Sequence, residues 1–347
     1  MTLFFSSKRK KEHLDIIRTK NTSSKSSSGL ENIILIPKTL PELDFAEIDT
    51  STSFLGKKIS APLLISSMTG GTEEALKINQ CLARAAQKYN IPLAIGSQKA
   101  MILHPELART YMVQSVAPNA IIVGNIGIDY LLSREYDIKK LKNACKQIGA
   151  RALYIHINPL QELAQPEGSK NFKGALDKIT EVCNKIGIPV LAKEVGDGFN
   201  PKTAKKLEKI GIRMIDVAGS GGTSWSAVEG YRGSTIGESF RNWGLSTTLS
   251  LISTKKHVKI PVIASGGIRD GQDIAKSIAL GADLAGVAQP FALAAFKGDK
   301  TLDQAIEKMI LELKVTMMLV GAKNISELKK SKYLMRSGLN SLLEQLG

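Results

Sequence analysis

The sequence predicts an α/β fold, a (β/α)8 TIM barrel preceded by a basic arm and extra elements. Eight short apolar segments are each followed by a polar or glycine-rich turn and then by a helical pattern. The segments recur roughly every 23 to 47 residues, as strand–helix units do in closed barrels. The length of 347 residues suits one barrel of about 250 residues with appendages.

The strands are expected to be parallel and covered on both faces, because the apolar segments show no alternation. A helix is predicted over 73–89 after the first strand, another over 271–280 between the last two, and a third over 303–319 after the barrel. The eight strands are predicted at residues 62–66, 92–95, 121–123, 152–157, 189–192, 214–217, 261–264 and 284–288.

The chain is predicted to divide into a basic arm with pre-barrel elements (1–60), a ligand-binding barrel (61–300) and carboxy-terminal helices (301–347). Two hypotheses suit the polar first 30 residues. They form a disordered basic arm, or an arm whose Arg9, Lys10 and His13 fold over an anionic ligand. The apolar stretch 33–36 predicts an extra strand or a lid.

The net charge of +15 raises the possibility of nucleic-acid binding. The lysines are spread along helices, however, and only 5% of residues are aromatic, which favours solvated helix faces and no nucleic-acid partner. No apolar run approaches the ~18 residues of a membrane span, and no signal segment opens the chain. Three cysteines without a CxxC motif indicate reduced thiols and a cytoplasmic location: Cys81, Cys145 and Cys183.

The segment SGGIR at 265–269 joins the predicted seventh strand to a helix. Two glycines let backbone amides approach a ligand, the helix start favours an anion, and Arg269 adds a guanidinium suited to phosphate. A barrel commonly holds a phosphate after its last two strands. The alternative is an ordinary βαβ turn.

Polar residues follow the other strands, and a barrel would bring them to one mouth. They are Ser67, Ser97, Asn125, Lys193, Thr223 and Arg269. Lys193 could form a Schiff base, serve as a fixed cation beside an electron-rich ring, or make an ordinary salt bridge. FMN suits this set, with Lys193 at the anionic edge of the ring, Asn125 and Ser97 on its heteroatoms, and Thr223 with the glycine turn on the phosphate.

The segment HINPLQE at 156–162 follows the fourth strand. His156 and Asn158 alternate, so both are expected to point into the mouth. Glu162 could hold Mg²⁺ that is otherwise bound by water and substrate phosphates. The alternatives are a solvated loop acid at Glu162 and a core histidine at His156.

Taken together, these motifs resemble type 2 isopentenyl diphosphate isomerase, a flavin-dependent family, in order over nearly the whole chain. The arm motif RKxEH and the segment HxNxxQE are specific, whereas SGGIR occurs in many flavin barrels. Two positions depart from the common pattern: Ala218 stands where some members have serine, and Lys99 where many have arginine. The motifs are RKxEH at 9–13, SSMTGG at 66–71, GSQK at 96–99, GNIG at 124–127, HINPLQE at 156–162, QPEG at 165–168, AKEVG at 192–196, GGTSW at 221–225 and SGGIR.

The resemblance implies specific roles for residues of this chain. Gln161, Glu162 and Lys193 would be catalytic, with Mg²⁺ at Glu162. FMN would contact Ser66, Ser67, Met68, Thr69, Ser97, Asn125, Lys193, Thr223, Gly267, Ile268, Arg269, Ala288 and Gln289. The substrate would contact Arg9, Lys10, His13, Ser97, Gln98, Lys99, His156, Asn158 and Gln161.

It further implies interconversion of isopentenyl and dimethylallyl diphosphate by proton transfer through reduced FMN, with NADPH or NADH as reductant. A homo-oligomer, tetramer or octamer, is expected. The alternative function on the same barrel is an FMN-dependent α-hydroxy-acid oxidase or dehydrogenase. That chemistry needs a histidine base, commonly in a turn after a late strand, and the turn at 219–223 has none.

Overall fold

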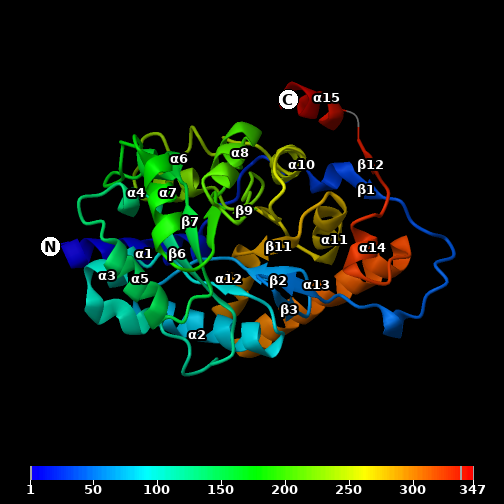
Figure 1. Ribbon diagram of the computed structural model, residues 1–347, viewed down its shortest axis with the longest axis horizontal. Helices are drawn as coiled ribbons and strands as arrows, with labels where there is room; N and C mark the ends of the chain where they lie inside the picture. The colour runs from blue at the N-terminus through cyan, green and yellow to red at the C-terminus, as the bar shows by residue number, and fades with distance from the viewer. Residues whose placement is uncertain (1, 337, 347) are drawn as a thin grey trace.

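Eight parallel strands close into a barrel, which confirms the predicted fold class (Figure 1). The computed structural model describes residues 2–336 and 338–346. Around the barrel the strands follow the order β10-β11-β4-β5-β6-β7-β8-β9. Their bounds are β4 (Leu63–Ile65), β5 (Leu93–Ala94), β6 (Ile122–Gly127), β7 (Ala152–His156), β8 (Val190–Lys193), β9 (Met214–Asp216), β10 (Val262–Ser265) and β11 (Leu284–Val287).

The third strand is longer than predicted. The segment GNIG was expected to be a turn, but β6 runs on to Gly127. It stays paired with β7 from Val123↔Ala152 to Gly127↔His156, so the ladder of the neighbouring strand extends it. Asn125 therefore projects from a strand and not from a loop.

Helices surround the barrel, and several of them begin at residues suited to capping. Thr72 accepts a hydrogen bond from the amide of Ala75 at the start of α2, and Asp270 accepts one from Asp273 in α11. The predicted third helix begins four residues earlier than expected. The outer helices are α2 (Glu73–Lys88), α5 (Ile138–Gln147), α7 (Ala175–Lys185), α8 (Pro201–Lys209), α10 (Thr247–His257), α11 (Gly271–Ala279), α12 (Gln289–Ala295) and α13 (Asp299–Val320).

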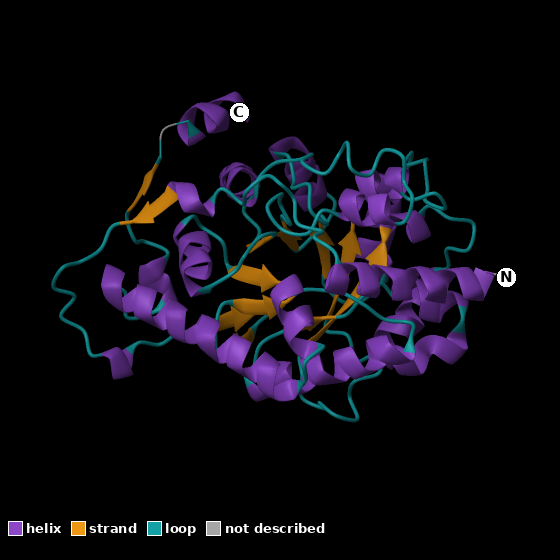
Figure 2. Ribbon diagram, turned by 180° about the vertical axis from the view of Figure 1, so that it is seen from behind, coloured by secondary structure: helices purple, strands orange, loops and turns teal. Residues whose placement is uncertain are grey.

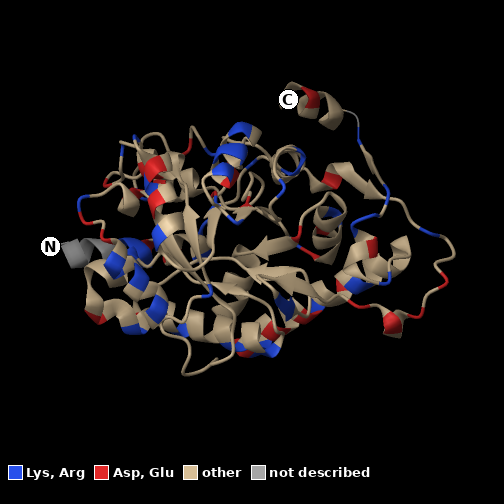
Figure 3. Cartoon of the chain, in the orientation of Figure 1, with Lys and Arg blue, Asp and Glu red and all other residues tan. Residues whose placement is uncertain are grey.

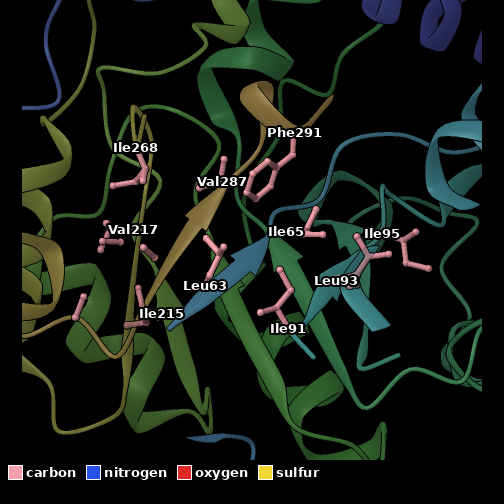
Figure 4. Close-up of a cluster of buried hydrophobic side chains, with 14 of the residues drawn as sticks. Leu63, Ile65, Ile91, Leu93, Ile95, Ile215, Val217, Ile268, Val287 and Phe291 are labelled. Atoms are coloured by element: carbon pink, nitrogen blue, oxygen red, sulfur yellow. The ribbon is translucent and has the colours of Figure 1, made fainter. Parts of the chain in front are cut away.

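The hydrophobic core has two layers because successive strand residues point to opposite faces. Leu63 and Ile65 belong to the outer cluster, which packs under the helices and part of which is drawn in Figure 4. Leu64, between them, belongs to a separate cluster inside the barrel. The hairpin of β2 (Thr52–Phe54) and β3 (Lys57–Ile59) adds Phe54 and Ile59 to this inner cluster.

A small two-stranded sheet joins the two ends of the chain. The apolar stretch after the arm forms strand β1 (Ile33–Leu35), so the extra strand predicted there is confirmed. This strand pairs antiparallel with β12 (Tyr333–Met335). Beside this sheet lies α15 (Leu339–Leu346) (Figure 1). This last helix carries neither Lys nor Arg, because the basic residues of the tail precede it. The division into three segments remains a prediction.

Lys and Arg are distributed over many outer helices, where Asp and Glu are interspersed with them (Figure 3). Within the described chain, no helix combines the length and apolar character that crossing a bilayer requires.

Candidate active site

A cavity of about 890 Å³ lies at the carboxyl ends of the barrel strands, within the range of ligand pockets. It is lined by residues that follow nearly every strand and by residues of α1 (Thr2–Thr19), the helix that begins at the label N in Figure 2. All the site residues predicted from sequence line this one cavity, with the exception of Gln98. The structure therefore brings together positions that are up to 280 residues apart in the chain (Arg9 and Gln289).

Gln98 points into the wall of the barrel. Its side chain is fully buried, and its Oε1 accepts a hydrogen bond from the amide of Asn125 at 3.2 Å. The helix α3 (Lys99–Leu103) begins immediately afterwards, so Ser97 and Lys99 line the cavity while the residue between them does not. The structure thus assigns Gln98 a contact with Asn125 where a substrate contact was predicted.

The inward positions of the strands change from apolar to polar at the level of the cavity. On β7, Tyr154 belongs to the inner apolar cluster and His156 lines the cavity. Asn125 on β6 donates from Nδ2 to Ser67 Oγ at 2.6 Å, and its Oδ1 lies 2.6 Å from His156 Nδ1. Burial lowers the pKa of His156 to about 4, so its imidazole is neutral at pH 7 and donates from Nδ1.

Lys193 stands at the end of β8 with only 8% of its surface exposed. Its Nζ donates to the Glu194 carbonyl at 3.1 Å and to Ser265 Oγ at 3.4 Å, and it lies 3.5 Å from Asp216 Oδ2. A fixed cation with a buried counter-ion therefore lines the base of the cavity. Asp216 was missed from sequence, although a carboxylate in the apolar run MIDVA is an available signal.

The glycine turn after β10 packs against the glycine-rich loop after β9. Gly266 and Gly267 have φ of +99° and +78°, which other residues rarely adopt. A Cβ on Gly267 would lie 2.6 Å from the carbonyl oxygen of Gly221, so the close approach requires glycine there. Gly267, Arg269 and Thr223 all line the cavity, as a phosphate cradle would.

Helix α1 covers the same cavity. Lys10 Nζ donates to the carbonyl of Ser97 at 3.2 Å and to the hydroxyl of Tyr111 at 2.5 Å. Burial, with a smaller contribution from the charge of Arg9, lowers the pKa of Lys10 to about 7. Helix α1 (Thr2–Thr19) is thus folded onto the barrel, where Lys10 contacts Tyr111, a residue that sequence reasoning missed.

Ion pairs attach α1 to α9 (Trp225–Tyr231). His13 Nε2 lies 2.8 Å from Glu229 Oε1, and the His13 ring meets Trp225 edge-on with centroids 5.3 Å apart. Arg232 then donates to Glu229 at 2.5 Å and to Glu12 at 3.0 Å. His13 lines the cavity, but one ring nitrogen faces a carboxylate. Its predicted substrate contact would have to use the other nitrogen.

Glu162 belongs to α6 (Pro159–Ala164) and is 7% exposed. Its Oε1 accepts from Asn158 Nδ2 at 3.2 Å and its Oε2 from the amide of Ser169 at 2.8 Å. Burial and then the charge of Asp129 raise the pKa of Glu162. Asn158 Oδ1 is buried and has no hydrogen-bond partner among the described residues.

The donors around Glu162 suit a hard cation that keeps most of its ligands from elsewhere. In the described part of the chain, no group of three or more His, Cys, Asp or Glu residues could enclose a metal. Lys99, a predicted substrate contact, lies 2.6 Å from Asp129, a second carboxylate of the cavity that sequence reasoning missed.

Comparison with known proteins agrees with this geometry. A family model described as FMN-dependent dehydrogenase matches residues 15–116 and 132–335. Among solved structures, a mandelate oxidase mutant with an FMN adduct superposes with a TM-score of 0.66 at 18% identity, over 92% of this chain and 95% of that one. A flavocytochrome b2 mutant with pyruvate bound gives a TM-score of 0.70 at 19% identity, over 95% and 84%. Identity this low establishes a shared fold only.

Sequence relatives are much closer. Isopentenyl-diphosphate delta-isomerase of Pyrococcus furiosus is 43% identical over 97% of this chain and 89% of that protein. The proteins of the same name from Rickettsia bellii and Nostoc are 45% and 43% identical, over 93% and 94% of this chain and 96% and 95% of theirs. The chain therefore belongs to the family of isopentenyl-diphosphate delta-isomerases, built on the barrel of the FMN-dependent dehydrogenases.

Proposed function

We propose that this protein interconverts isopentenyl diphosphate and dimethylallyl diphosphate, with FMN held by the barrel and the diphosphate held under helix α1. One observation carries the proposal. A single cavity combines a fixed cation and a glycine phosphate turn on the barrel with a second cationic group on α1. Two separate anionic ligands can therefore meet in one place.

The barrel half of the cavity fits FMN. Ser66 Oγ is buried without a hydrogen-bond partner among the described residues and lines the cavity, so a ligand atom could satisfy it. Lys193 supplies the positive charge that an anionic ring edge needs, and the turn at Gly267 with Arg269 and Thr223 suits the phosphate. The other proposed FMN contacts line the same half of the cavity: Ser67, Met68, Thr69, Ser97, Asn125, Ile268, Ala288 and Gln289.

The other half suits a diphosphate. Arg9 and Lys10 reach it from α1, and we assign Mg²⁺ to Glu162 with Asn158 Oδ1 as a further oxygen ligand. The isoprenoid tail offers no polar group, so the diphosphate must fix the substrate. The other residues proposed to orient it are Ser97, Lys99, His156 and Gln161.

When bound and reduced with NADPH or NADH, FMN would supply an electron-rich ring that gives a proton to the substrate carbons and takes one from them. The protein must hold the reacting carbons over that ring and exclude water, which α1 does by covering the cavity. The acids that line the cavity are already engaged, Glu162 with the Mg²⁺ assigned to it. Asp129 pairs with Lys99, while Glu12 and Glu167 pair with Arg232. None of these three is free to act as a general acid or base on the substrate.

The test is isomerisation of isopentenyl diphosphate, followed by NMR, with FMN, NADPH and Mg²⁺ added singly and together. Purified protein should be yellow, and product should appear only with reduced FMN. Reconstitution with 5-deaza-FMN, in which carbon replaces N5, should preserve binding and abolish turnover. Full activity with reduced 5-deaza-FMN would exclude N5 as the proton carrier. Anaerobic bleaching of the flavin by lactate or mandelate would instead support an α-hydroxy-acid oxidase.

Two further properties belong to the proposal. Cys81, Cys145 and Cys183 are unpaired thiols, which supports a reducing, cytoplasmic compartment.

Leu311, Val315 and Leu319 are exposed at helical spacing on α13, which supports assembly into a homo-oligomer. Sedimentation of the purified protein tests the second property.

A further inference from the structure

Asp216 is a carboxylate with no exposed surface, set in the interior of the barrel. It ends β9, where Met214 also points inward and Ile215 points outward toward the helices. Strand pairing puts Asp216 directly beside Lys193 on β8, and Lys193 beside His156 on β7. A buried anion thus lies in register with the cation assigned to the flavin.

Three neighbouring side chains surround this carboxylate. Ser265 Oγ donates to Asp216 Oδ1 at 2.5 Å, and Lys193 Nζ lies 3.5 Å from Oδ2. Burial, and then the charge of Asp216, raise the pKa of Tyr154 far above its ordinary value, so its hydroxyl stays protonated. Within the described chain, neither that hydroxyl nor Asp216 Oδ2 has a hydrogen-bond partner.

A fully buried charge is tolerated when an opposite charge compensates it. Lys193 is the cation within 4 Å of Asp216 in the described chain. Lys193 is itself held by the Glu194 carbonyl and Ser265 Oγ, and Ser265 also binds Asp216. Its ammonium group is therefore fixed in place and partly neutralised from the side opposite the cavity.

We propose that Asp216 is a positioning residue that holds Lys193 against the flavin and offsets part of its charge. It would thereby set the relative affinity of the site for oxidised and reduced FMN. This rests on the proposed FMN site. Compared with oxidised FMN, the anionic form of reduced FMN carries one additional negative charge on its ring. Removing the charge of Asp216 would leave Lys193 uncompensated and should favour that reduced form.

The first test is the reduction potential of FMN bound to the Asp216→Asn variant, which keeps the shape of the side chain. The preference for reduced over oxidised FMN should increase at least tenfold, which for a two-electron couple is a rise of about 30 mV. An unchanged or lower potential would overturn the proposal. Ser265→Ala and Tyr154→Phe remove hydroxyls without changing charge and should shift the preference less than threefold. A shift in Ser265→Ala equal to that of Asp216→Asn would also overturn it.

The second test needs no bound flavin. Full-length Lys193→Met and Asp216→Asn variants each leave one buried charge unpaired, so each should melt at a lower temperature than the wild type. The double variant should recover part of this loss, because neither charge remains. Additive losses would show that the two residues do not act as a pair. If wild-type protein bound no FMN, the proposed function would fail, while the melting temperatures would still decide whether Asp216 holds Lys193.

Discussion

The barrel mouth and helix α1 line the same cavity but are built differently. At the mouth, Asn125, His156 and Lys193 project from strands whose spacing is set by backbone pairing. On α1, Arg9 and Lys10 belong to a helix attached through side chains, chiefly the ion pairs of Glu12, His13, Glu229 and Arg232. The cavity therefore combines a permanent half, whose residues are held by backbone pairing of the strands, with a removable half, whose residues lie on a helix attached through side chains.

Each half suits the residence time of its proposed ligand. A cofactor that stays bound is served by groups that need no rearrangement, whereas a substrate must enter and leave in every turnover. The ion pairs that attach α1 centre on Glu229, which is fully buried, so lifting α1 must expose that carboxylate to water. The four predictions below ask whether the two halves can be damaged independently.

Lys193→Met should have the largest effect and should fall on the flavin. A unit charge about 4 Å from an anionic ring contributes roughly 4 kcal/mol at a moderate dielectric constant, so affinity for reduced, anionic FMN should drop about a thousandfold. Fluorescence quenching gives the affinity for oxidised FMN, and the reduction potential of the bound flavin then gives the affinity for reduced FMN. Lys99→Met, at a cavity lysine paired with Asp129, is the matched control and should keep FMN. Unchanged FMN affinity in Lys193→Met would mean that the ring lies elsewhere.

Glu162→Gln should leave FMN bound and reduce turnover about a hundredfold, since a neutral amide is a poorer ligand for a hard cation. The Mg²⁺ concentration for half-maximal rate should rise, which a magnesium titration measures. Glu181→Gln replaces a partly exposed acid on α7 that pairs with Lys178 and Lys185, and should change neither quantity. Normal turnover of Glu162→Gln at low Mg²⁺ would remove Glu162 from the site.

Replacing Arg9 and Lys10 by alanine should damage the removable half alone. Each lost charge-assisted bond should cost about 1.5–3 kcal/mol, or roughly ten- to a hundredfold in kcat/KM. The flavin spectrum and FMN affinity should not change. Deleting the first 20 residues should reproduce the loss. A deletion that leaves kcat/KM intact would show that α1 is not part of the substrate site.

The smallest expected effect is on the pH dependence of kcat/KM, which tests Lys10 on α1. Because the pKa of Lys10 is lowered to about 7, its positive charge is present below that pH and is lost above it. The value of kcat/KM should therefore fall above about pH 7 and level off after a loss of about tenfold, the lower end of the range given above for one contact. Lys10→Met should lack this step. In Arg9→Ala the step should move to higher pH, because a like charge beside Lys10 is removed.

The sequence predicted the strand-borne half of the site well, and the reason is geometric. In a parallel barrel all strands end at one mouth, so polar residues after apolar runs identify Lys193 and Asn125 without knowledge of their contacts. The order of residues in a turn is harder to interpret. In GSQK, Ser97 and Lys99 face the cavity and Gln98 faces the wall, which depends on where α3 begins.

Contacts between distant segments were beyond such reasoning. Tyr111 lies in η3 (Pro105–Tyr111) and meets Lys10 across about 100 residues of chain, and Glu229 meets His13 across 216. No local pattern marks either partner. The folded arm could be stated only as one of two hypotheses, because a helix stabilised by partners elsewhere in the chain has the composition of a disordered tail.

The pairing of β1 with β12 also has a consequence for biosynthesis. On the ribosome, Ile33–Leu35 emerges nearly 300 residues before its partner strand Tyr333–Met335, which at 5–20 residues per second is a delay of roughly 15–60 s. Until then an apolar strand has an unpaired edge that could associate with other nascent chains. Glu31 precedes it, and Pro37 and Lys38 follow, in the manner of gatekeeper residues that discourage such association.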